Sequence, residues 1–205
     1  MRAASAASTL ARREKPTDDL TSALLEAEID GDRLADDEVL GFMFLMVIAG
    51  NETTTKLRAN AAFWGHKNPD QLTPIYADLS RVPLWVEETL RYDTSSQILA
   101  RLAVADIPMH GGVIPDGSQV LLLAGSANRD PRAFDDPDVF RIGRDTQGIA
   151  SFGMGRHFCL GASLARLESR VCLDELVRAV ADYDIDEPAS RRVHSVNVRG
   201  FATLP

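Results

Sequence analysis

The sequence predicts a mainly α-helical fold with small β-sheets, and three observations support this prediction. A long helical pattern of apolar residues runs from Asp36 to about Trp64. A second helical repeat follows a glycine-rich loop that ends near Leu160. Between Ile98 and Leu123, short apolar runs alternate with Gly, Pro and Asp, which is typical of strands joined by tight turns.

The first part of the chain is expected to be helical. Leu20, Leu24 and Leu25 have helical spacing, and Gly31-Asp32 predicts a break after them. The long helix that follows has acidic residues in its first turn. Their negative charge is stabilised there by the positive end of the helix dipole. Its middle is apolar on all sides, which predicts that this helix crosses a protein interior.

The second part of the chain mixes helices, strands and irregular segments. Pro83 to Tyr92 predicts a helix, because proline suits the first helical turn. The other expected elements, in chain order, are a small sheet over 98–123, an irregular segment over 128–144, a helix with Leu160, Leu164, Leu167 and Val171 on one face, and a terminal hairpin over 193–204.

Composition indicates an ordinary globular protein. With 45% hydrophobic and 25% charged residues and no repeat or linker, we expect residues 1–205 to form a single domain. The net charge of −8 argues against nucleic acid or an anionic membrane as a partner. The longest apolar run, Val39 to Ala49, is too short to cross a bilayer, and two cysteines give no disulfide framework. We therefore expect a cytoplasmic protein with no membrane contact.

One cysteine lies in a glycine-rich loop directly ahead of a helical pattern. The loop reads FGMGRHFCLGA from Phe152, and it places Cys159 where the helix N-terminus favours a thiolate. Such a cysteine suits ligation of haem iron. The alternatives are a small buried thiol, a phosphate-binding turn, or a zinc site with His157, which lacks the further ligands that zinc requires.

Two other patterns place polar groups on helices. Ala49 to Thr55 reads AGNETTT, so an acid and three hydroxyls interrupt the apolar helix, although Thr hydroxyls often only bond to the preceding turn. Glu88 and Arg91 are spaced to share one helix face, where the ordinary interpretation is a solvated ion pair.

Taken together, these motifs resemble those of the cytochrome P450 family, the haem-thiolate monooxygenases. The loop fits F-G-x-G-x-H-x-C-x-G, the long helix carries A-G-x-[DE]-T-T, and the shorter helix carries E-x-x-R. The resemblance implies the C-terminal part of the P450 fold, with its long distal helix, E-x-x-R helix, cysteine loop and proximal helix. It also implies that the family's N-terminal half is not in this chain.

The resemblance implies haem b as a non-covalent cofactor with Cys159 as the thiolate ligand to iron. No C-x-x-C-H motif for covalent attachment is present. In this family the glycines matching Gly153 and Gly161 let the backbone approach the haem. Phe152 is then expected to shield the sulfur from water, and Arg101 and His157 are expected to bind the haem propionates.

The resemblance also assigns roles to the two helical motifs. Glu52 and Thr53 match the acid and alcohol that deliver protons during cleavage of the O–O bond, and we expect the Glu52 carboxyl to be buried. Glu88, Arg91 and Arg144 match a buried structural trio that fixes the cysteine loop.

The implied activity is insertion of one oxygen atom of O2 into a small organic substrate. Electrons would come from a ferredoxin or flavodoxin-type donor with a separate reductase, because the chain has no flavin or nicotinamide fingerprint. The expected docking surface surrounds Arg156 and the helix after Cys159. Two alternatives stay open, namely a truncated, non-catalytic haem-binding fragment and a peroxide-using haem-thiolate enzyme.

Overall fold

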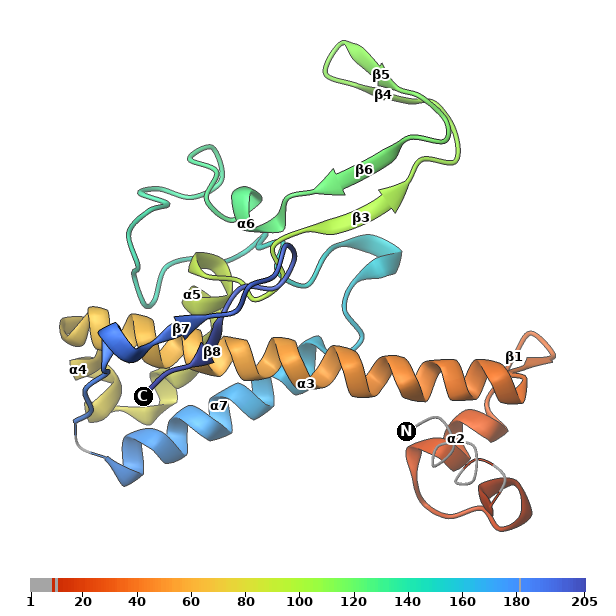
Figure 1. Cartoon of the computed structure of the whole chain (residues 1–205), viewed down its shortest axis with the longest axis horizontal. Coiled ribbons are helices and arrows are strands. Elements are labelled where there is room, and N and C mark those ends of the chain that lie inside the picture. Colours follow the sequence, from red (N-terminus) through yellow and green to blue (C-terminus); the bar gives the residue numbers. More distant parts are fainter. Residues whose placement is uncertain (1–8, 10, 181) are drawn as a thin grey trace. The chain divides into compact units, whose positions relative to one another are not determined.

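A computed structural model describes residues 9, 11–180 and 182–205 and shows a mainly helical chain with small two-stranded sheets (Figure 1). The predicted fold class is therefore confirmed. The chain divides into two compact units, Met1–Glu52 and Thr53–Pro205, and each is described by itself. That residues 1–205 form a single domain stays a prediction.

The first unit contains α2 (Leu20–Glu26), the hairpin of β1 (Glu28–Ile29) and β2 (Asp32–Arg33), and the start of α3 (Asp36–Lys67). Asp19 caps α2 by accepting a hydrogen bond from the Ser22 N–H at 2.9 Å. The break predicted at Gly31-Asp32 is the hairpin turn, where Asp30 and Gly31 both have positive φ. The short strands themselves were not predicted.

The long helix α3 begins where the acidic cluster predicts it. Glu38 accepts the Ala35 N–H at 2.8 Å, which is one half of a capping box. The prediction that its apolar middle crosses an interior is wrong for this structure. In the described part of the first unit, Thr21 of α2 contacts Met43 of α3 through its hydroxyl group. Four apolar side chains in the middle of α3 are nevertheless exposed, namely Phe44, Leu45, Val47 and Ile48.

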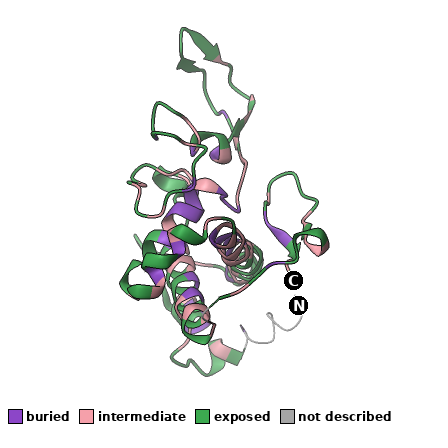
Figure 2. Ribbon diagram, turned by 90° about the vertical axis from the view of Figure 1, so that its left-hand side faces the viewer, coloured by how far each residue is buried: buried purple, intermediate pink, exposed green. Residues whose placement is uncertain are grey.

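The second unit has its core among the helices. The last part of α3 packs with α4 (Pro69–Ala77), α5 (Val82–Tyr92) and α7 (Ala162–Ala179), with the short helix η1 (Leu79–Arg81) leading into α5. Figure 2 shows buried residues gathered on these helices. Helix α4 was not predicted. The buried core side chains are Leu57, Ala61, Leu72, Ile75, Val82, Trp85, Val86, Leu90, Phe140 and Leu173.

Gly65 allows α3 to pack closely within this core. A Cβ at this position would lie 2.7 Å from Trp85 Cζ2 and 2.8 Å from the Tyr183 hydroxyl oxygen. The Trp85 ring is fully buried and donates to the Ala61 carbonyl at 3.1 Å. The Tyr183 hydroxyl donates to the Ala62 carbonyl at 2.7 Å, and burial raises the pKa of Tyr183. Because Gly65 has no side chain, α3 can lie this close to Trp85 and Tyr183.

The predicted small sheet is confirmed as two antiparallel pairs. Strand β3 (Leu99–Leu102) pairs with β6 (Gln119–Leu122). In the chain between these two strands, β4 (Ile107–Met109) pairs with β5 (Gly112–Ile114), and this hairpin extends beyond the β3–β6 pair (Figure 1). The short helix α6 (Ala124–Ala127) follows β6. After it, residues 128–154 contain no helix or strand, as the proline-punctuated sequence predicts for 128–144.

The structure has a terminal hairpin, as predicted, but its first strand lies just ahead of the predicted range of 193–204. After the short helix η3 (Glu187–Ala189), strand β7 (Arg191–Arg192) pairs with β8 (Phe201–Thr203). Lys56 of α3 donates from Nζ to the Phe201 carbonyl at 2.8 Å. The Lys56 side chain occupies the space beside Gly200, where a Cβ would lie 2.5 Å from Lys56 Cβ. The end of the chain is thus attached to α3.

Within the described residues, the helices are all too short or too polar to cross a membrane.

Candidate functional site

The cysteine lies at the end of a tightly folded loop. Its N–H donates to the Phe152 carbonyl at 2.8 Å, and the Gly153 N–H donates to the Ala150 carbonyl at 2.9 Å. Gly153 and Gly155 have φ of 69° and 65°, a region that favours glycine. The short helix η2 (Gly155–His157) completes the loop. This fold leaves Cys159 exposed as a free thiol.

Helix α7 begins directly after the cysteine. The Ala162 N–H donates to the Cys159 carbonyl at 3.2 Å, so the helix starts two residues later than the position near Leu160 that the sequence suggested. Gly161 precedes the first turn, and a Cβ there would lie 4.0 Å from Cys159 Sγ. The sulfur therefore lies close to the N-terminus of α7, as predicted.

The predicted apolar face of α7 is not its core face. Helix α7 buries Ala162, Ser169 and Leu173 instead. Spacing identifies which residues share a face, but only the neighbouring elements decide which face is covered. The exposed members of the predicted face are Leu160, Leu164, Leu167 and Val171.

Phe152 is half-buried between the loop and α7. Its ring centroid lies 6.3 Å from that of Phe158 and 4.5 Å from the guanidinium carbon of Arg166. Beside it, Leu99 Cδ1 would lie 3.7 Å from a Cβ at Gly153. The loop is therefore bordered by aromatic and aliphatic groups and by strand β3.

The structure brings the strand that carries Arg101 next to the loop that carries His157. Arg101 and Leu99 are two residues apart on β3 and thus lie on the same face. Arg101 is half-buried, and its Nη1 donates to the Ala100 carbonyl at 2.8 Å. His157 is exposed at the end of η2, and its carbonyl oxygen would lie 3.4 Å from a Cβ at Gly153. Propionate binding by Arg101 and His157 stays a prediction.

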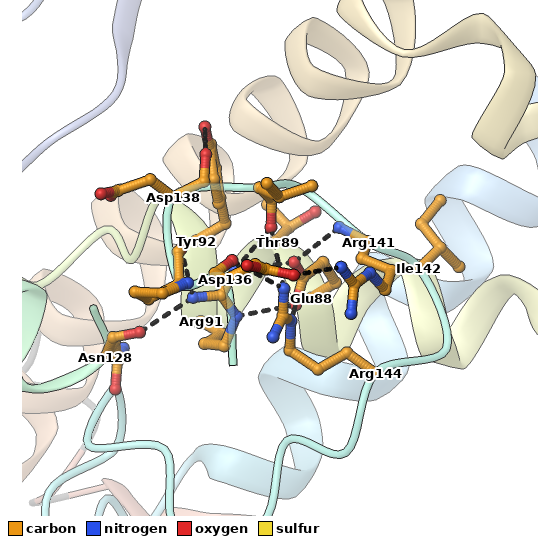
Figure 3. Close-up of polar contacts among 12 residues, drawn as sticks. Glu88, Thr89, Arg91, Tyr92, Asn128, Asp136, Asp138, Arg141, Ile142 and Arg144 are labelled. Carbon is orange, nitrogen blue, oxygen red and sulfur yellow. Dashed lines mark hydrogen bonds and ion pairs between the residues drawn. The ribbon is translucent and has the colours of Figure 1, made fainter. Parts of the chain in front are cut away.

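Glu88 and Arg91 form a fully buried ion pair, so the interpretation as a solvated pair is wrong (Figure 3). Arg91 Nε and Nη2 donate to the two carboxylate oxygens of Glu88, each at 2.8 Å. Its other donors reach the carbonyls of Asn128, Pro137 and Val139, which uses all five guanidinium N–H groups.

Arg144 joins this pair as the sequence predicts. Its Nε lies 3.5 Å from Glu88 Oε2, and its side chain is 6% exposed (Figure 3). Glu88 also accepts the Arg141 N–H at 2.8 Å. The buried carboxylate thereby holds both the E-x-x-R helix and the segment that leads toward the cysteine loop.

The sequence analysis missed Asn128, which is fully buried beside this trio. Its Nδ2 donates to the Ser151 hydroxyl at 2.8 Å and to the Leu90 carbonyl at 3.3 Å. Its Oδ1 accepts the Ala150 N–H at 2.7 Å. An Asn followed by Arg, Asp and Pro indicates only a turn, so no sequence signal pointed to these contacts.

A second missed group is centred on the buried Asp93. Trp64 Nε1 donates to Asp93 Oδ2 at 2.8 Å, Arg192 Nη1 donates to the same oxygen at 3.1 Å, and Arg199 Nε donates to Oδ1 at 2.5 Å. Both arginines line a cavity of about 400 Å³. The rest of its lining consists of Gln97, Ile98, Leu123, Ser126, Val193, Ser195, Val196, Val198 and Gly200.

The predicted proton-delivery residues are consecutive on α3. Glu52 is exposed and Thr53 is half-buried, so the expected burial of the carboxyl is wrong for this structure. Thr54, one residue further, is the buried hydroxyl of this segment. The chain divides into its two units between Glu52 and Thr53, and the role of this pair stays a prediction.

Comparisons with known proteins agree with these motifs. The sequence profile described as Cytochrome P450 matches residues 60–181. Cytochrome P450 123 of Mycobacterium tuberculosis is 60% identical over 94% of this chain and 48% of its own length. Cytochrome P450 monooxygenase PikC of Streptomyces venezuelae is 39% identical over 95% of this chain and 48% of its own length.

A solved structure has the same fold. Cytochrome P450 CYP109Q5 from Chondromyces apiculatus superposes with a TM-score of 0.94 at 43% identity, covering 99% of this chain and 53% of that chain. The chain thus spans about half the length of the curated relatives it matches. With the family profile and this fold in agreement, the chain belongs to the cytochrome P450 family, whose members bind haem through a cysteine thiolate.

Proposed function

We propose that this chain provides the thiolate side of a haem monooxygenase that inserts one oxygen atom of O2 into a small organic substrate. The observation that carries the proposal is the exposed Cys159 thiol, which the loop presents directly ahead of α7. Family membership supports the same chemistry. The chain has no candidate membrane helix in its described part, and we place its work in the cytoplasm.

The residues around Cys159 fit a flat, apolar group with a metal centre. The loop has glycine at positions 153, 155 and 161, and two of these have positive φ. The exposed apolar side chains of Met154, Phe158 and Leu160 flank the thiol. Haem b, bound non-covalently, would be held by Cys159 Sγ, and when bound it supplies activation of O2 at a thiolate-ligated iron.

The residues in and beside the loop can each be assigned a role in holding haem. The Cys159 N–H donates to the Phe152 carbonyl, which fixes the backbone at the cysteine, and the Cys159 residue itself is exposed. We assign to Phe152, whose ring lies near that of Phe158, the role of shielding the sulfur from water when haem is bound. We assign Arg101 and His157 to the two propionates, because both are cationic or hydrogen-bonding groups on elements that meet at Gly153.

Proton delivery is assigned to the acid and alcohol of α3. Glu52 would take a proton from solvent, which its exposure permits, and Thr53 would pass a proton onward from its hydroxyl. An exposed carboxylate suits the outer end of such a chain better than its inner end. This order is consistent with the half-burial of Thr53.

We propose places on the molecule for the substrate and for the electron donor. The cavity of about 400 Å³ beside Gln97 and Ile98 has mixed polar and apolar walls, which suits a small organic molecule. A ferredoxin or flavodoxin-type donor, reduced by a separate reductase, would dock near the exposed Arg156 and the exposed face of α7.

A non-catalytic haem-binding role is the second candidate. It is favoured by the exposure of Phe158 and Leu160, the residues directly before and after the cysteine. A haem held from one side only would bind but would not be shielded from water. The two roles differ in turnover and not in thiolate ligation.

The deciding experiment compares substitutions of two exposed cysteines, Cys159 directly ahead of α7 and Cys172 within α7. The chain is loaded with haem, reduced under carbon monoxide, and examined for the red-shifted Soret band of thiolate-ligated iron. We expect this band in the native chain and in Cys172→Ser, and its loss in Cys159→Ser, because only Cys159 lies in the loop. A band that survives in Cys159→Ser contradicts the proposal. Substrate oxidation with a supplied ferredoxin and reductase then separates the enzyme from the haem-binding fragment.

A further inference from the structure

The buried trio reaches the cysteine loop only indirectly. In the described part of the chain, the hydrogen bonds of Glu88 and Arg91 end on residues up to Arg141, which lies well ahead of the loop. Arg144 bonds back to the carbonyls of Asp135, Asp136 and Val139. Another residue must therefore connect the rigid trio to the segment that carries Cys159.

Asn128 makes this connection through its backbone carbonyl and its side-chain amide. Its backbone carbonyl accepts Arg91 Nη1 at 2.9 Å, which ties it to the ion pair. Its side chain bonds to both Ala150 and Ser151, the two residues directly ahead of Phe152. The Phe152 carbonyl accepts the Cys159 N–H, so hydrogen bonds and the short backbone segment from Ala150 to Phe152 together link the ion pair to the cysteine.

The same contacts complete the C-terminal end of α5. A helix leaves its last carbonyls without partners inside the helix. The Leu90 carbonyl receives Asn128 Nδ2 at 3.3 Å and the Ser151 hydroxyl at 2.6 Å. The end of the E-x-x-R helix and the start of the cysteine loop are thus fixed to each other through two side chains.

We infer that Asn128 is the positioning residue that fixes the start of the cysteine loop against α5 and so orients Cys159. The residue does not touch the sulfur, and it acts through Ala150, Ser151 and Phe152. The inference rests on the proposed function only where haem is concerned, because the geometry of the loop can be measured on the chain alone.

Amide hydrogen exchange on the haem-free chain tests this inference, with Asn60→Ala as the matched control. Asn60 is also a fully buried asparagine with backbone partners, but its contacts are to Asp93, Arg192 and Arg199 and none is to the loop residues Ala150, Ser151 or Phe152. Asn128→Ala keeps the backbone carbonyl that Arg91 uses. We expect it to speed exchange at the Cys159 N–H by about tenfold or more relative to α5 amides. We expect Asn60→Ala to leave that ratio unchanged.

Ser151→Ala is the second variant and keeps the test decisive if Asn128→Ala does not fold. It removes one of the hydrogen bonds between Asn128 and the loop and should raise the same ratio, by less than Asn128→Ala. Equal ratios in Asn128→Ala and Asn60→Ala, or an unchanged ratio in Ser151→Ala when Asn128→Ala is unfolded, would overturn the inference. Haem titration with the ferrous carbon monoxide spectrum is then expected to show weaker haem binding in Asn128→Ala than in Asn60→Ala. If the native chain binds no haem, the proposed function fails while the exchange result still stands.

Discussion

The guanidinium carbon of Arg166 lies 4.5 Å from the centroid of the Phe152 ring, so α7 contacts the very loop that precedes it. The same guanidinium donates from Nη2 to Glu87 Oε2 on α5 at 3.0 Å. One arginine therefore joins the proximal helix, the cysteine loop and the E-x-x-R helix. This contact is partly exposed, whereas the neighbouring pair of Glu88 and Arg91 is fully buried.

Arg166→Ala is expected to lower the free energy of unfolding by about 1 kcal/mol, because the ion pair is partly screened by solvent and the cation–π contact adds a similar small amount. Urea unfolding measures this loss. Arg170→Ala, one turn further on α7, is the control, since its contact to Asp174 is a longer 3.8 Å and its side chain is more exposed. A loss at Arg166 no larger than at Arg170 would show that the Phe152 contact contributes nothing.

Glu88→Ala is expected to destabilise the second unit by about 3–5 kcal/mol, because it leaves the Arg91 charge buried and unpaired. Glu87→Ala on the same helix is the control and should lose about 1 kcal/mol or less. The double variant Glu88→Leu with Arg91→Met should recover part of the loss, because it removes both buried charges. Denaturant unfolding gives the free energy of unfolding of all three variants. If Glu88→Ala lowers it no more than Glu87→Ala does, the buried pairing is refuted.

Gly65→Ala is expected to destabilise the second unit by about 1–3 kcal/mol, because the new methyl would overlap Trp85 and Tyr183. Gly41→Ala on the same helix meets nothing within 4 Å. It should stabilise its part of α3 by about 0.5–1 kcal/mol, since alanine is the better helix former. Thermal unfolding of the two variants should therefore shift in opposite directions, and a shift in the same direction would contradict the close packing at Gly65.

Asp130 is expected to titrate well below a normal carboxyl. Hydrogen bonds from the side chain and N–H of Arg132 lower the pKa of Asp130 to about 2. Because the folded value lies below the unfolded value of 3.8, the stabilising contribution is present above about pH 4 and is lost as the pH falls toward 2. Carboxyl carbon NMR should show this titration, and Arg132→Gln should move it upward. An unchanged Asp130 titration in Arg132→Gln would exclude the guanidinium as its cause.

Sequence patterns predicted the elements that have local signals. Each such signal lies within a few residues of the feature that it predicts. The acidic residues mark the first turn of α3, the proline marks the start of α5, and the glycines mark the turns of the loop around Cys159. Arg144 could be paired with Glu88 because the family motif supplied the spacing. These features could be recognised without any knowledge of tertiary contacts.

The features that were missed depend on contacts between distant residues. Asn128 bonds to a carbonyl 38 residues away, and Asp93 to an arginine 106 residues away, so neither leaves a periodic pattern. Apolar spacing predicts one shared face on α7, but the residues that α7 buries, Ala162, Ser169 and Leu173, are a different set. Which face of a helix is covered depends on its neighbours, and spacing alone carries no information about them.

The attachment of the chain's end to α3 affects when the second unit can fold during synthesis. Lys56 and Asn60 bond to Phe201 and Arg199, so the hydrogen bonds join residues 145 and 139 positions apart. A ribosome releases α3 long before it releases these partners. The packing of this part of α3 is therefore completed only after β8 has been translated, so this part of the core forms through contacts that are distant in sequence.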